Sequence, residues 1–347
     1  MEASVEGTTA WAGCVVENPA YISTGEVTFH FVASGSESVT ASYNVGGYQT
    51  YAQVQGVELK AGTEYSVYAS CKATNGESVV SNTTTIQTES AKASESWLEL
   101  PALRSDGRYP NAAEYKVYSG GEVNYTTYYD RSTYTSMWVA YPLESKHMGS
   151  YERPDKWSFN PLLSTSYQVN LCDHSYSSSY SRGHLIPNAS RNGIKDMQLQ
   201  TFYVTNSVPQ IQDNFNGGIW MYLEAAIQSI AESEKIYVVT GVAFQKEGET
   251  KSISYTTAKD DTKRVPVPNY FYKVVLKVNT NSSGVVTSAS TIGFWFDHKT
   301  YTDSYTNYAV SVDQIEAWTG FDFFANLPDA VERSAESNTS WSSFSSF

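Results

Sequence analysis

The pattern of apolar and polar positions divides the chain into two parts. In the first part, β-branched and aromatic residues alternate with polar residues in short segments, at 27–32, 65–71 and 81–86. Turn-forming residues such as Asn75-Gly76 separate these segments. Because a period of two is typical of strands with one buried face, we expect a small antiparallel β-sandwich over residues 1–90.

The second part mixes helical and strand patterns. Ser, Ala and Glu dominate the start of the stretch 91–112, which we expect to be a linker. Apolar residues at helical spacing predict a helix over 218–233, and β-rich segments predict strands at 236–240, 270–278 and 291–296. We therefore expect an α+β domain over residues 113–335 and a loose, Ser-rich tail at 336–347.

Composition narrows the class of protein. The 347 residues are 17% charged and 14% aromatic, which excludes disorder for most of the chain. No run of 18 apolar residues is present, so no membrane-spanning helix is expected. The net charge of −13 argues against non-specific binding of nucleic acid. Two windows, 146–195 and 259–277, are locally basic, which is equally consistent with a solvated face.

One of the five histidines, His184, lies in a context that favours catalysis. Arg182 lies two residues before it, and a stretch beginning at Thr201 reads as a strand that ends in Asn206. Asn216 then enters the predicted helix, which carries Glu224. One segment therefore supplies an imidazole, a guanidinium, two carboxamides and a carboxylate, which together could bind a metal and a phosphate.

The other four histidines give weaker signals. His30 lies within a predicted strand and is expected to be structural, whereas His147 is expected to be exposed. His174 is expected in a local turn, and His298 follows a strand without an evident partner.

These motifs and the segments 237–241, 265–276 and 311–324 resemble the DNA/RNA non-specific endonuclease family. These are the ββα-metal nucleases that include mitochondrial endonuclease G, and the resemblance covers residues 97–335. It implies an α+β domain with a mixed sheet and an enzyme that hydrolyses phosphodiester bonds in DNA and RNA. The implied cofactor is Mg²⁺, with Mn²⁺ or Ca²⁺ as alternatives.

The resemblance also implies a role for each site residue. His184 would be the general base, and Asn216 would be the one direct metal ligand. Glu224 would hold metal-bound waters, and Asn206 would help to position the site.

Two arginines match the family, and two positions depart from it. Arg182 belongs to the family's Arg-Gly-His tripeptide and would bind phosphate, and Arg153 resembles an upstream family arginine. Ser181 stands where the family usually has an acid, which would weaken the site unless another residue compensates. Gln228 replaces an arginine that some members carry one turn after the helix glutamate.

Each of these residues taken singly could also have a purely structural role. Asn206 and Asn216 could cap turns or the helix, Glu224 could be solvated, and Arg182 could pair with an acid. The competing function is a surface glycan- or protein-binding protein with a decayed nuclease domain, since abundant Tyr and Trp suit sugar stacking. Cleavage of a plasmid with Mg²⁺ distinguishes the two functions.

The segment 59–67 resembles a part of fibronectin type III domains in which a tyrosine closes a corner of the sandwich. It predicts an immunoglobulin/fibronectin III-like first domain. We expect an exported bacterial protein, secreted, periplasmic or at the cell surface, with its targeting segment absent from this chain. Pairing of Cys14 with Cys71, homodimer formation and an inhibitor partner are left open.

Overall fold

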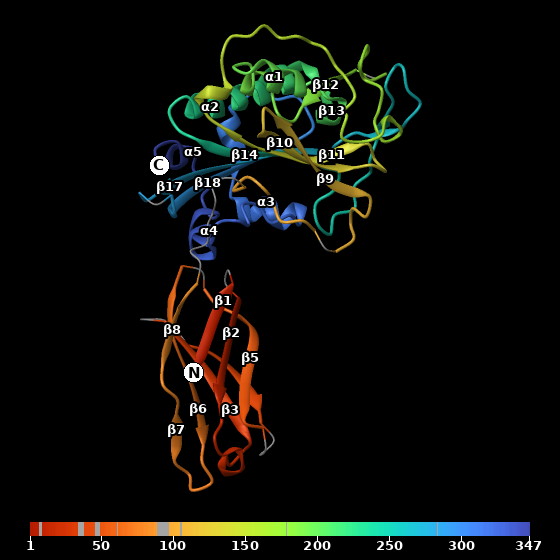
Figure 1. The fold of residues 1–347 in the computed structure, drawn as a ribbon. Coiled ribbons are helices and arrows are strands. Elements are labelled where there is room, and N and C mark those ends of the chain that lie inside the picture. The colour runs from red at the N-terminus through yellow and green to blue at the C-terminus, as the bar shows by residue number, and fades with distance from the viewer. Residues whose placement is uncertain are drawn as a thin grey trace. The chain divides into compact units, whose positions relative to one another are not determined.

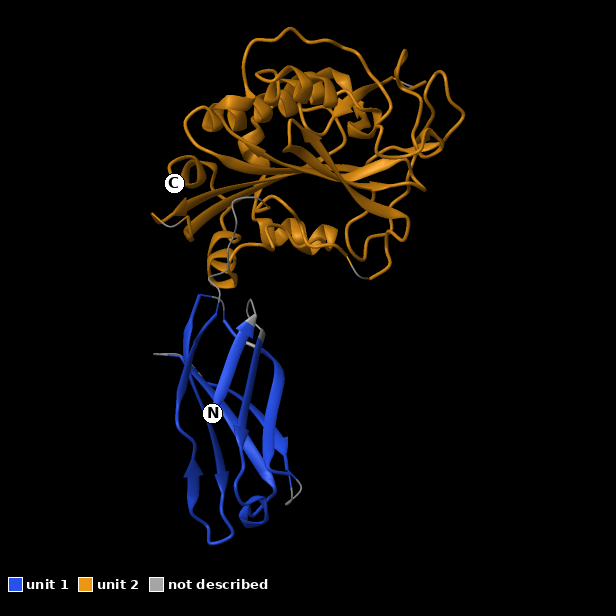
Figure 2. Cartoon of the chain, in the orientation of Figure 1, with its two compact units in different colours: residues 1–95 blue, residues 96–347 orange. Residues whose placement is uncertain are grey.

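The chain forms two compact units, Met1–Glu95 and Ser96–Phe347 (Figure 2). The computed structural model describes residues 1–347 except 7–8, 34–37, 46–48, 61, 89–96, 105, 178 and 283. Each unit has a hydrophobic core of its own.

The first unit is all-β and consists of two antiparallel sheets around one core (Figure 1). One sheet has the order β1-β2-β5; the other has the order β4-β3-β6-β7, and β8 also pairs with β6. Apolar residues alternate along β3, which buries Phe29 and Phe31 completely, as the period of two predicts. The strands are β1 (Glu2–Glu6), β2 (Thr9–Val15), β3 (Glu26–Ala33), β4 (Val39–Asn44), β5 (Tyr51–Glu58), β6 (Glu64–Lys72), β7 (Ser78–Val80) and β8 (Thr84–Gln87).

A buried tyrosine closes one corner of this unit. Tyr65 is 3% exposed, and its hydroxyl accepts a hydrogen bond of 3.0 Å from the backbone N–H of Lys60. This is the contact that a tyrosine corner requires, although the immunoglobulin-like assignment stays a prediction. Cys14 and Cys71, whose pairing the sequence left open, are free thiols, and so is Cys172.

The second unit is built on a seven-stranded sheet with the order β19-β18-β17-β14-β11-β10-β9. Helices α1 and α2 and the hairpin-like pair β12-β13 cover one face, and α3 and α4 cover the other (Figure 1). The central strand β14 is therefore buried along its whole length, which explains its near-continuous apolar sequence.

The remaining strands are β9 (Ala112–Ser119), β10 (Glu122–Asp130), β11 (Thr135–Leu143), β12 (Tyr180–His184), β13 (Ser207–Ile211), β14 (Ile236–Ala243), β15 (Tyr255–Thr256), β16 (Val265–Pro266), β17 (Tyr270–Thr280), β18 (Val286–Asp297) and β19 (Ala309–Val310). The α-helices are α1 (Lys195–Gln200), α2 (Met221–Ala231), α3 (Val312–Thr319), α4 (Asp329–Ala335) and α5 (Trp341–Ser345). Short 3-10 turns are η1 (Pro19–Tyr21), η2 (Ser145–His147), η3 (Thr165–Tyr167), η4 (Asn188–Ser190), η5 (Val204–Asn206) and η7 (Tyr305–Tyr308), and an irregular helical turn, η6 (Gln212–Trp220), precedes α2.

The predicted α+β class is confirmed, but the expected mixed sheet is wrong. Every pairing within the seven-stranded sheet is antiparallel. Strands β9, β10 and β11 are consecutive in the chain and lie next to one another as a meander. Strands β14, β17 and β18 are also neighbours in the sheet, in the order in which they occur along the chain, and each runs opposite to the one before it.

The expected linker 91–112 also needs correction. Residues 91–96 and 105 lie outside the described residues. Leu98 is fully buried, the backbone of Ala102 pairs with Asp322, and Arg104 forms an ion pair with Glu247 at 2.8 Å. The chain from Trp97 onward is therefore part of the second unit and not a free connection.

The expected loose tail is likewise ordered. Residues 341–345 form α5, and Phe344 is fully buried in the core of the second unit. Trp341 packs edge-on against Phe294 of β18 at a centroid distance of 5.6 Å. Burial of two aromatic side chains therefore orders the tail despite its high Ser content.

Candidate active site

A pair of short strands positions the Arg-Gly-His motif. β12 carries Arg182 and His184 and pairs in antiparallel register with β13. Gly183 lies between them because a Cβ at this position would come within 2.3 Å of Oε1 and 2.6 Å of Cβ of Gln210. The glycine therefore lets the Gln210 side chain pass across β12.

The turn η6 and helix α2 position Asn216 and Glu224. Trp220 and Leu223 are fully buried and fix this segment against the sheet. The backbone leaves helical geometry at Asn214, where φ is +56°, and again at Gly218. These breaks let Asn216 precede the regular helix, while Glu224 lies in the first turn of α2.

One cavity of about 810 Å³ brings five of the six predicted residues together, and we call it the site cavity. Its walls come from β12, η6, α2 and the loops around residues 155, 177, 188 and 259. The lining residues are Arg153, Asp155, Trp157, Ser175, Tyr176, Ser177, Ser179, Tyr180, Ser181, Arg182, His184, Pro187, Asn188, Ala189, Gln212, Asn216, Glu224 and Lys259.

His184 is held between aromatic rings at the wall of the site cavity. Its ring centroid lies 4.7 Å from that of Trp157 and 5.0 Å from that of Phe202. Burial, together with the charges of Arg153 and Arg182, lowers the pKa of His184 to about 3. Its Nε2 is buried without a hydrogen-bond partner, so a neutral ring with a free acceptor can face a ligand.

The replacement of the usual acid by Ser181 leaves a hydrogen-bonded link to Asn216. The amide nitrogen of Asn216 donates to Oγ of Ser181 at 3.2 Å and to Oε1 of Gln212 at 2.9 Å. Ser181 in turn donates to the backbone carbonyl of Gln210 at 3.0 Å. With its nitrogen engaged twice, the amide presents its carbonyl oxygen as the group for a ligand.

Glu224 forms an ion pair with a buried lysine, which the sequence did not reveal. Nζ of Lys273, on β17, lies 3.5 Å from Oε1 of Glu224 and donates to Oγ1 of Thr240 at 2.8 Å. Burial raises the pKa of Glu224, and the ammonium opposes this shift. The lysine therefore favours the charged carboxylate at the cavity wall.

The two predicted arginines differ in how firmly they are held. Arg182 donates to the carbonyl of Leu171 at 2.9 Å and stacks over Trp157, with 4.8 Å from Cζ to the ring centroid. Arg153 is half-exposed and lies over the ring of Phe202. Arg182 is thus preorganised, whereas Arg153 is held only by a long ion pair of 3.8 Å with Asp155 and is more open to solvent.

Asn206 does not line the site cavity. It lies in the turn η5, before β13, so the strand expected to end at this residue is wrong. Its fully buried amide donates to the carbonyls of Ile186 and Thr201 and accepts from the N–H of Ile186. Asn206 therefore fixes the backbone at Ile186, two residues after His184.

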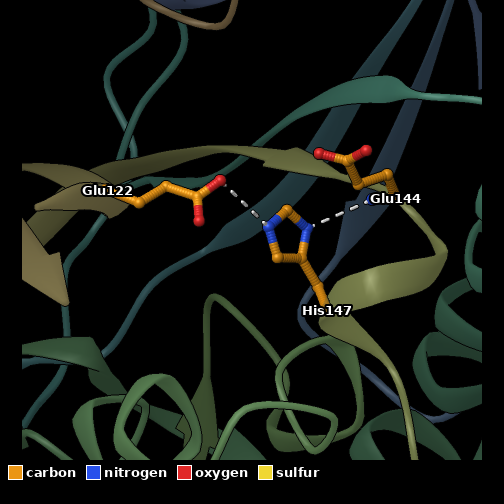
Figure 3. Close-up of side chains that lie close together, drawn as sticks. All are labelled: Glu122, Glu144 and His147. Carbon is orange, nitrogen blue, oxygen red and sulfur yellow. Dashed lines mark hydrogen bonds and ion pairs between the residues drawn. The ribbon is translucent and has the colours of Figure 1, made fainter. Parts of the chain in front are cut away.

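Two other expectations about histidines are wrong. His147 is 1% exposed, and its Nδ1 accepts a hydrogen bond from the N–H of Glu144, while Nε2 faces Glu122 at 3.9 Å (Figure 3). His298 has partners on both ring nitrogens, the carbonyl of Pro268 and the N–H of Ile211. Both rings belong to the structural framework.

The other two histidines also lie away from the site cavity. His30 bonds to Ser70 at 2.7 Å and stacks on Tyr68, which agrees with a structural role. His174 is exposed and pairs with Asp260 at 2.7 Å.

The sequence missed several cavity residues. Trp157, Gln212 and Lys259 line the site cavity, and Lys273 lies behind Glu224. Lys273 had a signal, because a lysine in the otherwise apolar segment 270–276 must find a buried partner. The other three have no local pattern that distinguishes them from surface residues.

The chain is similar in sequence and in fold to known nucleases. The family model of the DNA/RNA non-specific endonucleases matches residues 110–330. A curated nuclease of Nostoc sp. is 30% identical over 220 residues, which are 61% of this chain and 75% of that protein. Human mitochondrial nuclease EXOG is 30% identical over 213 residues, 59% of this chain and 56% of that protein.

A solved structure of the EndoG/EndoGI complex shares the fold. It aligns with a TM-score of 0.54 and 20% identity, over 70% of this chain and 95% of that chain. The family match covers more than half of the chain and includes the strands, turn and helix that build the site cavity. The chain therefore belongs to the DNA/RNA non-specific endonuclease family and is a nucleic-acid hydrolase.

Proposed function

We propose that this chain is a Mg²⁺-dependent endonuclease that hydrolyses phosphodiester bonds in DNA and RNA, with His184 as the general base. The observation that carries the proposal is the shared cavity, which is lined by an unpartnered imidazole nitrogen, a fixed amide, a carboxylate and three cationic side chains. Contacts to the phosphate backbone are independent of base sequence, so little sequence preference is expected.

The residues present fit a hard divalent cation. Mg²⁺ prefers oxygen ligands and retains several waters, and the carbonyl oxygen of Asn216 and the carboxylate of Glu224 are oxygen donors in the same cavity. Asn216 would bind the ion directly, and Glu224 would accept hydrogen bonds from its waters. When bound, the ion would supply positive charge against the phosphate oxygens.

His184 would take the proton of the attacking water. A water between Nε2 and the phosphorus would transfer its proton to the ring as its oxygen bonds to phosphorus and the bond to the leaving oxygen breaks. The free ring has a low pKa partly because Arg153 and Arg182 are near. An incoming phosphate would offset both positive charges, so substrate binding would raise the basicity of His184.

The cations at the cavity would orient the polymer. Arg182 is preorganised by its bond to Leu171, and its planar group suits two phosphate oxygens. Arg153 and Lys259 also line the cavity and would bind phosphates on either side of the reacting one.

Cleavage of supercoiled plasmid and of an RNA transcript tests the proposal. The full chain should cut both with Mg²⁺ and stop when EDTA is added. His184→Ala should lose at least about 100-fold in rate because it removes the base. His174→Ala is the matched control, since this exposed histidine lies outside the site cavity, and it should cut like the parent.

Asn216→Ala separates the metal role from the base. It should raise the Mg²⁺ concentration required for half-maximal cleavage, whereas His184→Ala should leave that concentration unchanged. Undiminished cleavage by His184→Ala would refute the assigned base. A parent protein that binds polysaccharide and cuts neither polymer would favour the competing binding function.

A further inference from the structure

Helices α3 and α4 lie on the sheet face opposite α2 (Figure 1). A group of acidic side chains comes from α3 and from the end of α4. Asp313 and Glu316 are one turn apart on α3, and Glu336 follows the last residue of α4. One carboxylate oxygen from each of the three residues lies within 4.8 Å of the others. We call this group the α3–α4 acid cluster.

The cluster lacks a compensating cation among the residues that the structure describes. Glu336 is 5% exposed, and its Oε1 is buried without a hydrogen-bond partner. No described lysine or arginine forms an ion pair with Asp313, Glu316 or Glu336. Buried negative charge without a partner is costly, so the cluster must bind either protons or a cation.

The ionisation behaviour agrees with this description. Burial and the neighbouring carboxylates of Glu316, Glu332, Asp313 and Asp322 raise the pKa of Glu336 to about 9. Burial likewise raises the pKa of Glu316 to about 7, although the N–H of Phe323 donates to its Oε1 at 2.7 Å.

Another acidic group in the described chain differs from the α3–α4 acid cluster, because a lysine neutralises its carboxylates. Glu122, Glu144 and His147 lie close together (Figure 3). The ammonium of the adjacent Lys146 lies 2.6 Å from Glu122 and 3.1 Å from Glu144. Nδ1 of His147 accepts a hydrogen bond, so Nε2 of the neutral ring carries the proton and offers no lone pair. That group already has its cation and does not predict a metal.

We propose that Asp313, Glu316 and Glu336 form a calcium site that ties α3 to the end of α4. Oxygens up to 4.8 Å apart can share one ion at the 2.3–2.6 Å distances typical of Ca²⁺. Asp313 is exposed, so water can complete the coordination from its side. Mg²⁺ suits the site less because it needs shorter distances and near-octahedral geometry.

The backbone around the cluster already links the same two helices. The carbonyl of Glu336 accepts from the N–H of Val312 at 3.0 Å, at the start of α3. Thr291 of β18 donates to the carbonyl of Ala335 at 2.8 Å. An ion at the cluster would therefore stabilise the contact of both helices with β18.

Thermal unfolding of the full chain, freed of divalent ions and held at pH 8, tests the site. Addition of CaCl₂ at ten times the dissociation constant should raise the unfolding midpoint by about 3–5 °C. Glu336→Gln and Asp313→Asn should abolish this rise, and both should keep Mg²⁺-dependent plasmid cleavage. Glu232→Gln, at an exposed acid on α2's C-terminal end, is the matched control and should keep the rise.

Asn216→Ala distinguishes this site from the site cavity, because it removes the proposed catalytic ligand and should keep the calcium-dependent rise. Loss of the rise in Asn216→Ala would assign the calcium to the site cavity and overturn the inference. A rise that persists in Glu336→Gln would also overturn it. So would a midpoint that rises on acidification from pH 8 to 6 and does not respond to calcium, because the carboxylates would then share protons.

Discussion

At the scale of single residues, the site depends on side chains that are held by their neighbours before any ligand binds. The ring of His184 is fixed by Trp157 and Phe202, and the amide of Asn216 is fixed by Ser181 and Gln212. Such preorganisation reduces the rearrangement that catalysis requires. The supporting residues therefore offer tests that leave the reacting groups in place.

Ser181→Ala should weaken metal binding. It removes the hydroxyl that accepts from the Asn216 amide, so the ligand oxygen is less firmly directed. Loss of such a supporting contact typically costs about 10–100-fold in metal affinity or activity. The Mg²⁺ concentration for half-maximal plasmid cleavage should rise accordingly, and Ser233→Ala, at an exposed serine, should leave it unchanged. An unchanged Mg²⁺ requirement in Ser181→Ala would show that Gln212 alone directs the amide.

Lys273→Met should change both stability and the pH dependence of cleavage. Removal of the ammonium leaves Glu224, which is 16% exposed at the cavity wall, without a cation. We expect a loss of up to about 3 kcal/mol in the free energy of unfolding, the lower end of the range for a fully buried pair. The pKa of Glu224 should then rise, so the acid limb of the pH–rate profile should move to higher pH. Because a raised pKa favours the folded state at low pH, this variant should lose more stability at pH 8 than at pH 5.

The double variant Glu224→Gln/Lys273→Met provides the control. It removes both charges, so it should recover much of the lost stability while cleavage stays low. Denaturant unfolding and plasmid cleavage measure the two effects separately. Equal stability of the single and double variants would contradict the ion-pair argument.

Most residues of the candidate site could be predicted from the sequence, but not all of them. Arg182, His184, Asn216 and Glu224 were identified because they lie in one segment whose motif resembles a family, and they line one cavity. Lys273 was missed because its partner lies on another element, and only folding brings β17 behind α2. Contacts between distant segments have no signature in local spacing.

At the scale of elements, the helices and strands that bury many apolar side chains are the ones that the sequence predicts correctly. The predicted helix at 218–233 and strands at 236–240, 270–278 and 291–296 are confirmed as α2, β14, β17 and β18, because strong apolar patterns mark them. The expectation of a loose tail is wrong, because Trp341 and Phe344 pack against the core although the segment is rich in Ser. A few large apolar side chains are enough to anchor a short helix.

Phe344→Ala tests that anchor. Phe344 is fully buried beside the core of the second unit, so its truncation should cost about 3–5 kcal/mol in the free energy of unfolding. Phe347→Ala is the matched control, because Phe347 is 42% exposed, and it should change stability little. Denaturant titration followed by tryptophan fluorescence measures both. A small loss in Phe344→Ala would mean that the tail is not part of the cooperative core.

At the scale of the whole molecule, the two units have separate cores and the site cavity lies entirely in the second. The chemistry proposed above draws on no residue before Arg153. We therefore expect the reaction itself not to require the first unit.

A fragment of residues 96–347 should fold and cut plasmid at nearly the rate of the full chain, within about threefold. Circular dichroism and plasmid cleavage at matched Mg²⁺ concentrations check this expectation. A folded fragment without cleavage would show that the first unit takes part in catalysis or in holding the polymer.

The charge of the molecule has a further consequence for how it would work along a strand. With a net charge of −13, the chain as a whole repels a polynucleotide, while Arg153, Arg182 and Lys259 bring positive charge to the site cavity. Because the overall charge opposes binding, we expect attraction to be concentrated on the phosphates near these three side chains. We expect distributive action, in which the enzyme leaves after each scission and early digests contain many singly nicked molecules beside untouched ones.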